Sequence, residues 1–463
     1  MSKNGSYDFD VIVVGGGPGG YVAAVRASQG GLTSAIIEQD RLGGICLNWG
    51  CVPAKSLLRS AEVYELINRA GDFGITIEGV DHKWPEIIQR SRKISDALSN
   101  GIDFLMKKNG IKVFHGKGIF EGENRLRVEG EYRGVLSARN IILATGAQTQ
   151  SIPGVTIDRK KIITSREALE IKKQPKSMVI VGAGAIGVEF ASFFDSFGSA
   201  VTLVEMLDRI LPAGDEEISK RLKAFFRRRG IRVITSTNVE EINPAVDICR
   251  VRVNTGEEIE CEKVLIAAGV KGNLGGIGLE HAGVACKRRF VIVDNTYRTT
   301  KESIWAVGDC IGPPLLAHAA TLEAECAVES ILGRNVNSPE HHLIPLCMYS
   351  KPNVASVGFT EKDAKKNGYD VAVGKCPFRS IGQAMALGEP EGLVKVILDR
   401  KSGKILGAHI IGTGANEIIQ EIVLAMHAGV SAEQLIKTVH PHPTLSEAVK
   451  EAVASALGKS INL

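Results

Sequence analysis

Two cysteines five residues apart are the side chains of this sequence best suited to redox chemistry. They end the segment Cys46-Leu-Asn-Trp-Gly-Cys51. Such a pair could form a reversible disulfide, ligate a metal ion, or fill a core as two small apolar side chains. No second cysteine or histidine pair at ligand spacing lies nearby, which argues against a metal. A disulfide closing so short a loop adds little stability, so pairing in a reducing compartment would favour catalysis.

The spacing of these cysteines excludes a regular helix between them if their sulfurs pair. Residues five apart in an α-helix differ by about 7.5 Å of rise and about 140° of rotation, which places their Cα atoms ~9 Å apart. A disulfide requires about 4.4 to 6.8 Å. Asn48 and Gly50 permit an irregular backbone here, and Pro53 is a good first-turn residue for a helix over 55–70.

The other cysteines number seven of the nine in this chain of 463 residues. They are scattered singly, which predicts core positions for each of them. An odd total spread over a long chain favours a reducing compartment over a secreted disulfide framework. No apolar run is long enough for a signal peptide or a membrane span, and we expect a cytoplasmic location. The seven are Cys249, Cys261, Cys286, Cys310, Cys326, Cys347 and Cys376.

A histidine near the C-terminus is the candidate for proton transfer. The segment His440-Pro-His442-Pro-Thr-Leu-Ser-Glu447 has a proline after each histidine, which forces extended backbone at both and permits a cis bond before Pro443. Glu447 should begin the final helix, placed to orient an imidazole. The alternative is a turn with surface histidines. Three further histidines, His318, His409 and His427, lie within apolar runs, which favours structural roles.

Two repeated units of strand, glycine turn and helix must position this chemistry. The first has an apolar run at 10–14, the turn Gly15-Gly-Gly17-Pro-Gly-Gly20 and a helix over 21–28. The second has a run at 178–181, the turn Gly182-Ala-Gly184-Ala-Ile-Gly187 and a helix over 188–197. In each unit an acidic residue, Glu38 or Glu205, ends the next apolar run 18 residues after the third glycine. Two copies in identical register predict two dinucleotide sites, where a single copy would be weak.

The residue types in these units suit a pyrophosphate and a ribose. The first glycine permits the tight turn, the second lets the backbone approach the pyrophosphate, and the third allows close packing of helix on strand. The phosphates then lie at the positive end of the helix. The carboxylate of Glu205 would bind a ribose and repel a 2′-phosphate. Met206 and Leu207 follow it with no immediate arginine, although Arg209 is close, so the second site should prefer NAD over NADP.

Each unit closes with a further strand that ends in glycine. These strands are Asn140-Ile-Ile-Leu-Ala-Thr-Gly146 and Lys263-Val-Leu-Ile-Ala-Ala-Gly269. The first unit is longer by 44 residues, and its insertion contains the cysteine pair. A third such strand, Ser303-Ile-Trp-Ala-Val-Gly-Asp309, reaches an acid at its carboxyl end, where ligands bind in open α/β sheets. Asp309 is therefore a candidate contact to the first nucleotide, and it could also cap a helix.

The composition fits a multidomain globular protein. At ~150 residues per domain, 463 residues suggest about three domains. The 56 basic and 52 acidic residues nearly cancel, which argues against a disordered chain or a polybasic nucleic-acid binder, and we expect neither nucleic acid nor membrane as a partner. After about residue 345, alternating apolar runs such as 393–398 and 405–411 suggest antiparallel strands flanked by helices, hence a separate α+β domain.

These motifs together resemble the pyridine nucleotide-disulfide oxidoreductases. The resemblance rests on the two glycine turns, Ala144-Thr-Gly146, Val307-Gly-Asp309, the segment from His440 to Glu447 and Gly43-Gly-Ile-Cys46-Leu-Asn-Trp-Gly-Cys51-Val-Pro-Ala-Lys55. It implies an α/β fold with two Rossmann-like dinucleotide-binding domains and a C-terminal α+β dimerisation domain. The implied boundaries are 1–148 and 271–342 for the two parts of the FAD-binding domain, 149–270 for the NAD-binding domain and 343–463 for the dimerisation domain.

The same resemblance implies a role for each candidate residue. FAD would occupy the first site and NAD the second, in a homodimer whose active site uses both subunits. Cys46 would exchange with substrate, Cys51 would face the flavin, and His442 of the partner subunit would act as base, held by Glu447. Lys55 and Glu189 match a pair near the flavin's reactive nitrogen. Cofactor contacts would come from Gly15, Gly17, Gly20, Glu38, Lys55, Gly146, Asp309, His318, Gly182, Gly184, Gly187, Glu189, Glu205 and Gly269.

The substrate that the resemblance implies is a dihydrolipoyl group. Its carrier would be a lipoylated E2 or carrier protein of a 2-oxo acid dehydrogenase or glycine cleavage complex. Several positions depart from the usual pattern: the loop Gly269-Val-Lys-Gly-Asn273, Gln383, and Asn353 after Pro352. The alternatives are a related FAD/NAD(P)H disulfide reductase with another substrate, or a flavoprotein that serves mainly as a binding or scaffold subunit.

Overall fold

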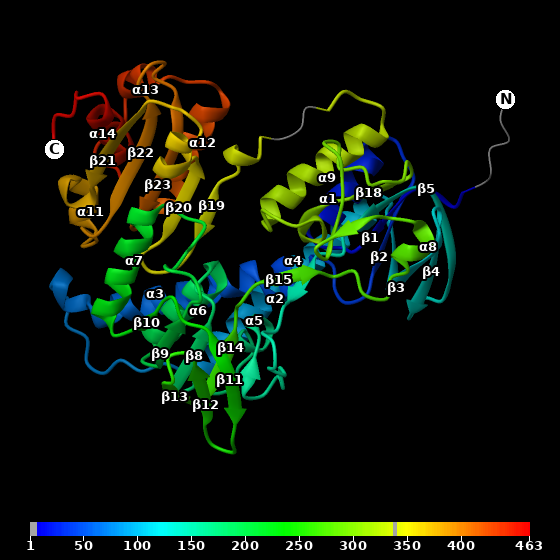
Figure 1. Cartoon of the computed structure of the whole chain (residues 1–463), viewed down its shortest axis with the longest axis horizontal. Coiled ribbons are helices and arrows are strands. Elements are labelled where there is room, and N and C mark those ends of the chain that lie inside the picture. Colours follow the sequence, from blue (N-terminus) through cyan, green and yellow to red (C-terminus); the bar gives the residue numbers. More distant parts are fainter. Residues whose placement is uncertain (1–6, 337–339) are drawn as a thin grey trace. The chain divides into compact units, whose positions relative to one another are not determined.

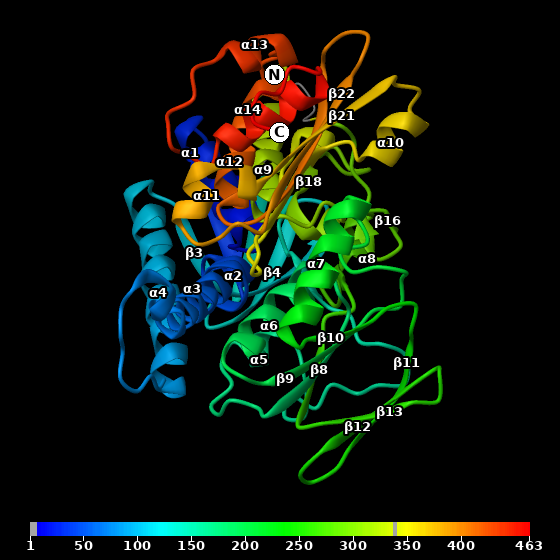
Figure 2. The same cartoon turned by 90° about the vertical axis from the view of Figure 1, so that its left-hand side faces the viewer.

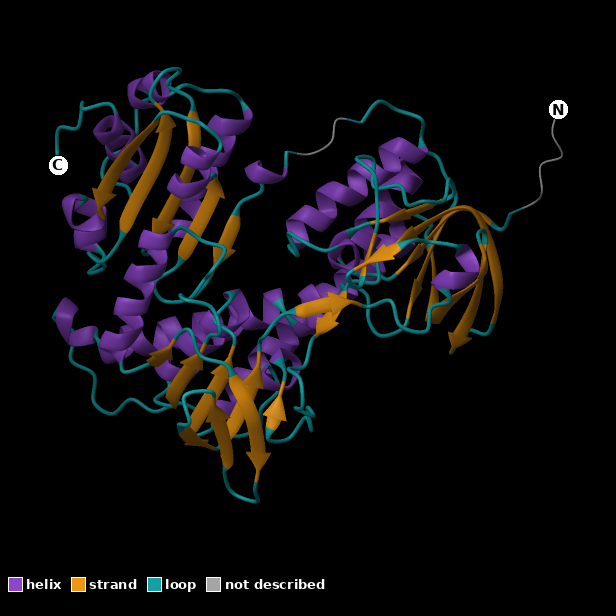
Figure 3. Cartoon of the chain, viewed as in Figure 1, coloured by secondary structure: helices purple, strands orange, loops and turns teal. Residues whose placement is uncertain are grey.

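The computed structural model describes residues 7–336 and 340–463, which divide into two compact units (Figure 1). Unit 1 is drawn from Met1–Ser56, Pro85–Gln150 and Gly269–Pro339, and unit 2 from Leu57–Trp84, Ser151–Ala268 and Glu340–Leu463. In each unit helices (purple in Figure 3) pack on strands (orange). This arrangement agrees with the predicted α/β class.

A mainly parallel sheet forms the centre of unit 1. Strand β1 (Phe9–Val14) pairs in parallel with β2 (Ser34–Glu38) and with β5 (Gly134–Leu143), which in turn pairs with β18 (Ile304–Ala306). The residues of β1 and β2 are almost all buried, as expected for continuous apolar runs in a parallel sheet covered on both faces. The carboxyl ends of β1 and β5 therefore lie side by side, and the first glycine turn follows one of them.

Helices of unit 1 cover this sheet and carry the insertion. Helix α1 (Pro18–Gln29) packs against α9 (Ala317–Ile331) through its buried alanines. The insertion supplies α2 (Gly44–Trp49), α3 (Cys51–Asn68) and α4 (Trp84–Lys108), the last two of which contribute residues to both units. The remaining strands and short helix are β3 (Lys112–Gly122), β4 (Arg125–Gly130), β6 (Ala147–Thr149), β15 (Val270–Gly272), β16 (Cys286–Lys287), β17 (Phe290–Val291) and α8 (Leu279–Ala282).

Unit 2 contains a second parallel sheet built like the first. Its order is β10-β9-β8-β14-β7, and helix α6 (Ala185–Ser196) joins β8 to β9. The sheet β11-β12-β13 lies at one end of it in both views (Figures 1 and 2). The elements are β7 (Ile162–Ile163), α5 (Ser165–Ala168), β8 (Ser177–Val181), β9 (Ala200–Val204), α7 (Glu216–Arg229), β10 (Arg232–Ile234), β11 (Val239–Pro244), β12 (Cys249–Val253), β13 (Glu258–Cys261) and β14 (Lys263–Ile266).

The C-terminal part of unit 2 has the predicted antiparallel sheet with helices. Its order is β19-β20-β23-β22-β21, and the runs predicted as strands are β22 (Leu393–Asp399) and β23 (Ile405–Ile411). Helices α12 and α14 pack against this sheet through a buried apolar cluster that includes Phe378 and Ile410. The other elements are β19 (Leu346–Met348), β20 (Val354–Gly358), α10 (Glu361–Lys366), β21 (Val371–Pro377), α11 (Gly382–Ala386), α12 (Ala415–His427), α13 (Ala432–Lys437) and α14 (Glu447–Ala456).

The starts of three predicted helices differ from the structure, and the helix expected over 188–197 begins at Ala185. The helix expected from residue 55 begins four residues earlier, at Cys51, because Pro53 lies within the first turn, where its missing N–H is not needed. The helix expected from Tyr21 begins at Pro18 for the same reason. Among the described helices, none has both the length and the apolar composition needed to cross a membrane.

Candidate functional site

The first glycine turn is shaped by two positions that exclude a side chain. Gly15 has φ +105°, and a Cβ there would overlap the carbonyl oxygen of Ala144 at the end of β5. A Cβ on Gly20 would overlap the carbonyl oxygen of Gly15, so the helix lies directly on the turn. Gly17, the N-cap of α1, has no neighbour closer than 3.9 Å to its missing Cβ. The turn therefore leaves space at the N-terminus of α1, where a pyrophosphate fits.

The carboxylate of Glu38 lies next to this turn. It accepts hydrogen bonds from the backbone N–H of Gly16 at 2.6 Å and of Asp40 at 2.7 Å. Burial raises the pKa of Glu38 above its usual value, although these two hydrogen bonds oppose the effect. Each carboxylate oxygen has a second lone pair, so the side chain can still accept a ribose hydroxyl.

The second turn repeats the geometry of the first. Gly182 has φ +104°, and Cβ atoms on Gly182 and Gly187 would overlap the carbonyl oxygens of Ala267 and Gly182. Gly184 has no neighbour within 4 Å of its missing Cβ. Glu205 accepts hydrogen bonds from the backbone N–H of Ala183 at 2.7 Å and of Leu207 at 2.9 Å. The two units predicted from the sequence therefore have the same geometry of glycine turn, helix and carboxylate.

The nearby arginine of the second site is directed into its own loop. The guanidinium of Arg209 donates to Asp208 at 3.4 Å and to the carbonyl oxygen of Pro212 at 3.3 Å. A 2′-phosphate at Glu205 would meet a carboxylate without a dedicated cation. The geometry therefore favours NAD over NADP at the second site.

The two redox cysteines lie on different helices. Helix α2 ends at Trp49, Gly50 has φ −154° and ψ −108°, and α3 begins at Cys51. This break in the helix at Gly50 is what the five-residue spacing requires if the two sulfurs are to pair. Gly43 donates its N–H to the carbonyl oxygen of Gly16 at 2.8 Å, and a Cβ on Gly44 would lie 2.6 Å from the Cα of Gly17. The thiol segment therefore starts against the first nucleotide turn.

The electrostatics of the pair distinguish its two thiols. A hydrogen bond with Cys51 raises the pKa of Cys46, and burial acts in the same direction. Lys55 lowers the pKa of Cys46 and Asp309 raises it further. Cys51 is the first residue of α3, where the helix dipole favours a thiolate. The raised pKa keeps the proton on Cys46 in the dithiol state.

Two polar groups of unit 1 follow neighbouring strands, since Thr145 comes just after β5 and Asp309 just after β18. The hydroxyl oxygen of Thr145, beside Gly146, is buried and has no hydrogen-bond partner among the described residues. Burial raises the pKa of Asp309, which follows β18. A bound dinucleotide with ribityl hydroxyls would supply partners to both groups, so the residues fit a flavin nucleotide at the first turn. The described ranges 7–336 and 340–463 contain no convergent group of three histidine, cysteine or acidic side chains for a metal ion.

The C-terminal histidine segment holds one imidazole in a defined orientation. Nδ1 of His442 lies 2.9 Å from Glu447, the first residue of α14, whose other oxygen accepts the N–H of Thr444 at 2.9 Å. The His442–Pro443 bond is cis, as the sequence permits. The His442 side chain is 77% exposed, whereas that of His440 is 6% exposed and contacts Glu421 at 2.7 Å. Of these two histidines, His442 is therefore the one with an exposed ring.

The remaining predicted residues lie in various environments. Glu189 on α6 is buried and accepts the backbone N–H of Tyr349 at 2.9 Å. Lys55 is half-buried in the second turn of α3. His318, the second residue of α9, is exposed, and its place in a flavin site stays a prediction. His409 is buried and hydrogen-bonded to Ser356 and Phe359, in keeping with a structural role. Gly269 has φ +113° and space beside it.

The predicted core position is wrong for one of the other cysteines. Cys286, in the two-stranded ribbon β16–β17, is exposed. Cys249 and Cys261 are buried as predicted, and the pairing of β12 with β13 places them opposite each other. The sequence signal that could have found this pair is the turn residue Gly256 between two alternating runs. Tyr21 was also missed: burial and the charge of Cys46 raise its pKa, so it lies near the thiols.

Comparison with known proteins assigns the family. The profile described as Pyridine nucleotide-disulphide oxidoreductase matches residues 9–324, and the profile of its dimerisation domain matches residues 344–453. The chain is 43% identical to a dihydrolipoyl dehydrogenase of Rhizobium etli, over 98% of this chain and 99% of that protein. It is 44% identical to the dihydrolipoyl dehydrogenase of Chlorobaculum parvum, over 99% of each chain.

Solved structures agree with this assignment. LpdA from Mycobacterium tuberculosis is similar with a TM-score of 0.90 at 26% identity, over 96% of this chain and 98% of that one. The HOCl-induced flavoprotein disulfide reductase RclA from Escherichia coli, as its Cu(II) complex, has a TM-score of 0.88 at 28% identity, over 98% and 99%. Since sequence and structure match over nearly the whole length, this chain belongs to the pyridine nucleotide-disulphide oxidoreductase family.

Proposed function

We propose that this protein is an NAD-dependent dihydrolipoyl dehydrogenase, which oxidises dihydrolipoyl dithiols to the lipoyl disulfide. The observation that carries the proposal is the thiol pair Cys46 and Cys51, which begins directly against the first nucleotide turn. The family uses FAD and NAD, and the two turns offer one site for each. The identity of more than 40% to several dihydrolipoyl dehydrogenases supports this substrate over others.

The first task of the site is to remove a proton from the substrate. In its neutral form the His442 ring donates Nδ1–H to Glu447, which leaves Nε2 free to accept a thiol proton. The charge of His442 lowers the pKa of Glu447, together with the N–H of Thr444 and against the effect of burial. Glu447 therefore stays ionised and stabilises the imidazolium that results.

The thiol exchange then follows from the asymmetry of the two cysteines. In the oxidised enzyme a substrate thiolate attacks the sulfur of Cys46, which breaks the Cys46–Cys51 disulfide and leaves the negative charge on Cys51. The second substrate thiol attacks the substrate sulfur of the mixed disulfide, and its proton passes to the departing Cys46 sulfur, whose pKa is raised. The products are a lipoyl disulfide and a dithiol enzyme. The flavin supplies the two-electron chemistry that links this dithiol to NAD.

The partners follow from the exposed histidine and the matched domain. His442 lies in the segment that matches a dimerisation domain, and its ring is exposed within the single chain. We infer a homodimer in which His442 of one subunit serves the thiols of the other. The dithiol carrier would be a lipoylated E2 or carrier protein of a 2-oxo acid dehydrogenase or glycine cleavage complex. We also propose a cytoplasmic location, since a reducing compartment suits the scattered cysteines.

The decisive variant is Cys46→Ser. It should lower dihydrolipoamide:NAD turnover by at least about 1,000-fold, because the attacked sulfur is gone. NADH-to-quinone activity should persist, since it needs no thiol exchange. Cys286→Ser is the matched control, because this exposed cysteine lies outside the site. Equal loss of both activities in Cys46→Ser, with normal flavin content, would refute the role of the thiols.

A substrate panel separates this function from that of a related disulfide reductase. Dihydrolipoamide, glutathione and Hg(II) are compared under steady-state conditions with NAD and NADP cofactors. We expect the largest kcat/KM for dihydrolipoamide with NAD. A larger value for another substrate would assign the chain to a different member of the family.

A further inference from the structure

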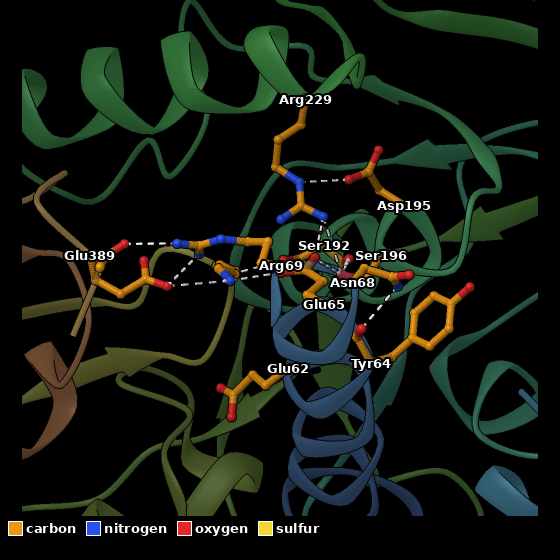
Figure 4. A network of polar contacts seen from close by, with 12 residues as sticks. Glu62, Tyr64, Glu65, Asn68, Arg69, Ser192, Asp195, Ser196, Arg229 and Glu389 are labelled. Carbon is orange, nitrogen blue, oxygen red and sulfur yellow. Dashed lines mark hydrogen bonds and ion pairs between the residues drawn. The ribbon is translucent and has the colours of Figure 1, made fainter. Parts of the chain in front are cut away.

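A buried carboxylate at the far end of the thiol helix joins three elements of unit 2. Glu65 lies near the C-terminus of α3, and its side chain is only 13% exposed. It accepts hydrogen bonds from Arg229 of α7 and, at 2.6 Å, from the hydroxyl of Ser196 of α6. Figure 4 shows Arg229 between Glu65 and Asp195, and the guanidinium donates to Asp195 at 2.7 Å. The ends of three helices are therefore tied at one point.

The third partner of Glu65 comes from a short segment after β19. Lys351 places its ammonium 2.8 Å from the second carboxylate oxygen of Glu65. Both oxygens of Glu65 are thus occupied by cationic partners, and the charge of Arg229 and Lys351 lowers the pKa of Glu65 to about 2 although burial alone would raise it. The contact fixes Lys351 at the end of α3.

The backbone beside Lys351 is bound to the helix of the second nucleotide site. The N–H of Lys351 donates to the hydroxyl of Ser192 on α6 at 2.9 Å, and the N–H of Tyr349 donates to Glu189 on α6 at 2.9 Å. Between them Ser350 is 1% exposed, and its carbonyl oxygen accepts an N–H from Asn353 at 2.9 Å. We call residues 349–351 the strap. It has two backbone attachments on α6 and one side-chain attachment on α3.

We propose that Lys351, held by Glu65, is a positioning residue for Glu189. The inference rests on the proposed function and on the family resemblance, which implies a place for Glu189 near the flavin's reactive nitrogen. Glu189 lies one turn into α6, the helix that begins at the second nucleotide turn, so it belongs to the NAD side of the site. The Tyr349 N–H can hold the Glu189 carboxylate in one orientation only while the strap is fixed. The side chain of Lys351 supplies the attachment of the strap to α3, in addition to its two backbone attachments to α6.

The strap has one further charged neighbour, which does not replace Glu65. Lys351 lies 3.6 Å from Glu389, but Glu389 already accepts a hydrogen bond from Arg69 at 2.8 Å. When Glu65 loses its charge, Lys351 can turn toward Glu389 and away from α3. The strap then shifts relative to Glu189, and the step that depends on Glu189 slows while the thiol exchange does not.

The test measures the two half-reactions separately in the FAD-containing dimer. Reduction of the oxidised enzyme by dihydrolipoamide reports the thiol step, and reoxidation of the reduced enzyme by NAD reports the hydride step. Lys351→Met should slow the hydride step by about 3- to 30-fold and leave the thiol step unchanged. Glu65→Gln should do the same, and Lys351→Arg should recover most of the rate because it keeps the cation.

Two controls separate positioning from folding. Glu62 lies on α3 like Glu65, but its carboxylate pairs with Arg59 and is not joined to the contacts of Glu65 (Figure 4). Both half-reactions of Glu62→Gln should therefore keep wild-type rates. In a Glu189→Gln background Lys351→Met should have no further effect on the hydride step, since Lys351 acts by orienting the Glu189 carboxylate, which that background lacks.

Three results would overturn the proposal. They are a wild-type hydride rate in Lys351→Met, an equal slowing of both half-reactions, and a full additional effect of Lys351→Met in the Glu189→Gln background. Because Lys351 is partly exposed, its variant decides the question even if Glu65→Gln does not accumulate. A wild-type enzyme that fails to oxidise dihydrolipoamide would refute the proposed function instead.

Discussion

The two nucleotide turns share one backbone but differ in what covers them. Gly15 and Gly182 have φ values of +105° and +104°, and both N-cap glycines have φ near −70° with extended ψ. The positions between the fixed glycines differ: Gly16 and Gly19 in the first turn correspond to Ala183 and Ile186 in the second. The first and third glycines of each turn are therefore required by the turn itself, whereas Gly16 and Gly19 are required by the surroundings of the first turn.

The surroundings explain the additional glycines of the first turn. A Cβ on Gly16 would lie 2.5 Å from the side chain of Leu42, and one on Gly19 would lie 3.2 Å from the carbonyl oxygen of Ala320 on α9. In the second turn Ile186 is 41% exposed. The first turn is enclosed by the thiol segment and α9, whereas the second is open on that side. This difference suits a resident cofactor at the first turn and an exchanging one at the second.

The largest expected effect tests the shared backbone. Gly20→Ala and Gly187→Ala each place a methyl group on a carbonyl oxygen that cannot move away, so each should destabilise its own sheet by about 4 kcal/mol. Gly20→Ala should abolish flavin content, measured from visible absorbance. Gly187→Ala should lower NAD reduction in protein that still binds flavin. Gly184→Ala is the control for folding, because nothing lies within 4 Å of its Cβ position. Full flavin content in Gly20→Ala would contradict the geometric argument.

The next effect tests how each unit holds a buried carboxylate. Burial raises the pKa of Glu38, whereas Arg229 and Lys351 lower that of Glu65 to about 2. A lowered native pKa means that the unfolded chain binds the proton more readily, so the contribution of Glu65 is present above pH ~4.5 and is lost as pH falls toward about 2. Over this pH range the unfolding free energy of the wild type should fall by about 3 kcal/mol more than that of Glu65→Gln.

Urea unfolding of both proteins between neutral and acidic pH measures this difference. Glu38 contributes with the opposite sign, since its raised pKa favours the protonated native state and its contribution falls as pH rises. Glu38→Gln therefore gives the matched comparison. Parallel acid dependence of Glu65→Gln and wild type would show that the cations do not hold Glu65 ionised.

The smallest effect tests the enclosure of the first turn. Gly16→Ala should cost about 1 to 2 kcal/mol, because the end of the Leu42 side chain is flexible but buried. Ala183→Gly at the corresponding position should cost about 0.5 to 1 kcal/mol through backbone entropy alone. The urea unfolding midpoints of the two variants show which substitution lowers stability more. A larger loss for Ala183→Gly would mean that the two turns are enclosed alike.

Much of the site could be predicted from local sequence because its determinants are local. The glycines, the acid 18 residues later and the break at Gly50 each depend on backbone geometry within a few residues. The start of α14 at Glu447 and the cis bond before Pro443 are likewise set by neighbours in the chain.

Contacts between distant segments could not be predicted in this way. Glu65 and Lys351 are 286 residues apart, and neither has an unusual neighbour in the sequence. The facing of Cys249 and Cys261 depends on strand register, since a shift of one residue would separate them. The exposure of Cys286, in a ribbon whose Val291 is buried, likewise depends on contacts that no local pattern reports.

The exposure of Cys286 gives this protein an internal reference for thiol labelling. Five of the nine cysteines are buried and should react slowly with an alkylating reagent in the folded enzyme, whereas Cys286 is exposed and Cys347, like the redox pair, is half-buried. The stoichiometry of rapid labelling, counted against the equivalents from Cys286 and Cys347, therefore reports the oxidation state of Cys46 and Cys51. Cysteines that take no part in the thiol exchange thus allow the redox state of the site to be measured without the visible absorbance of the flavin.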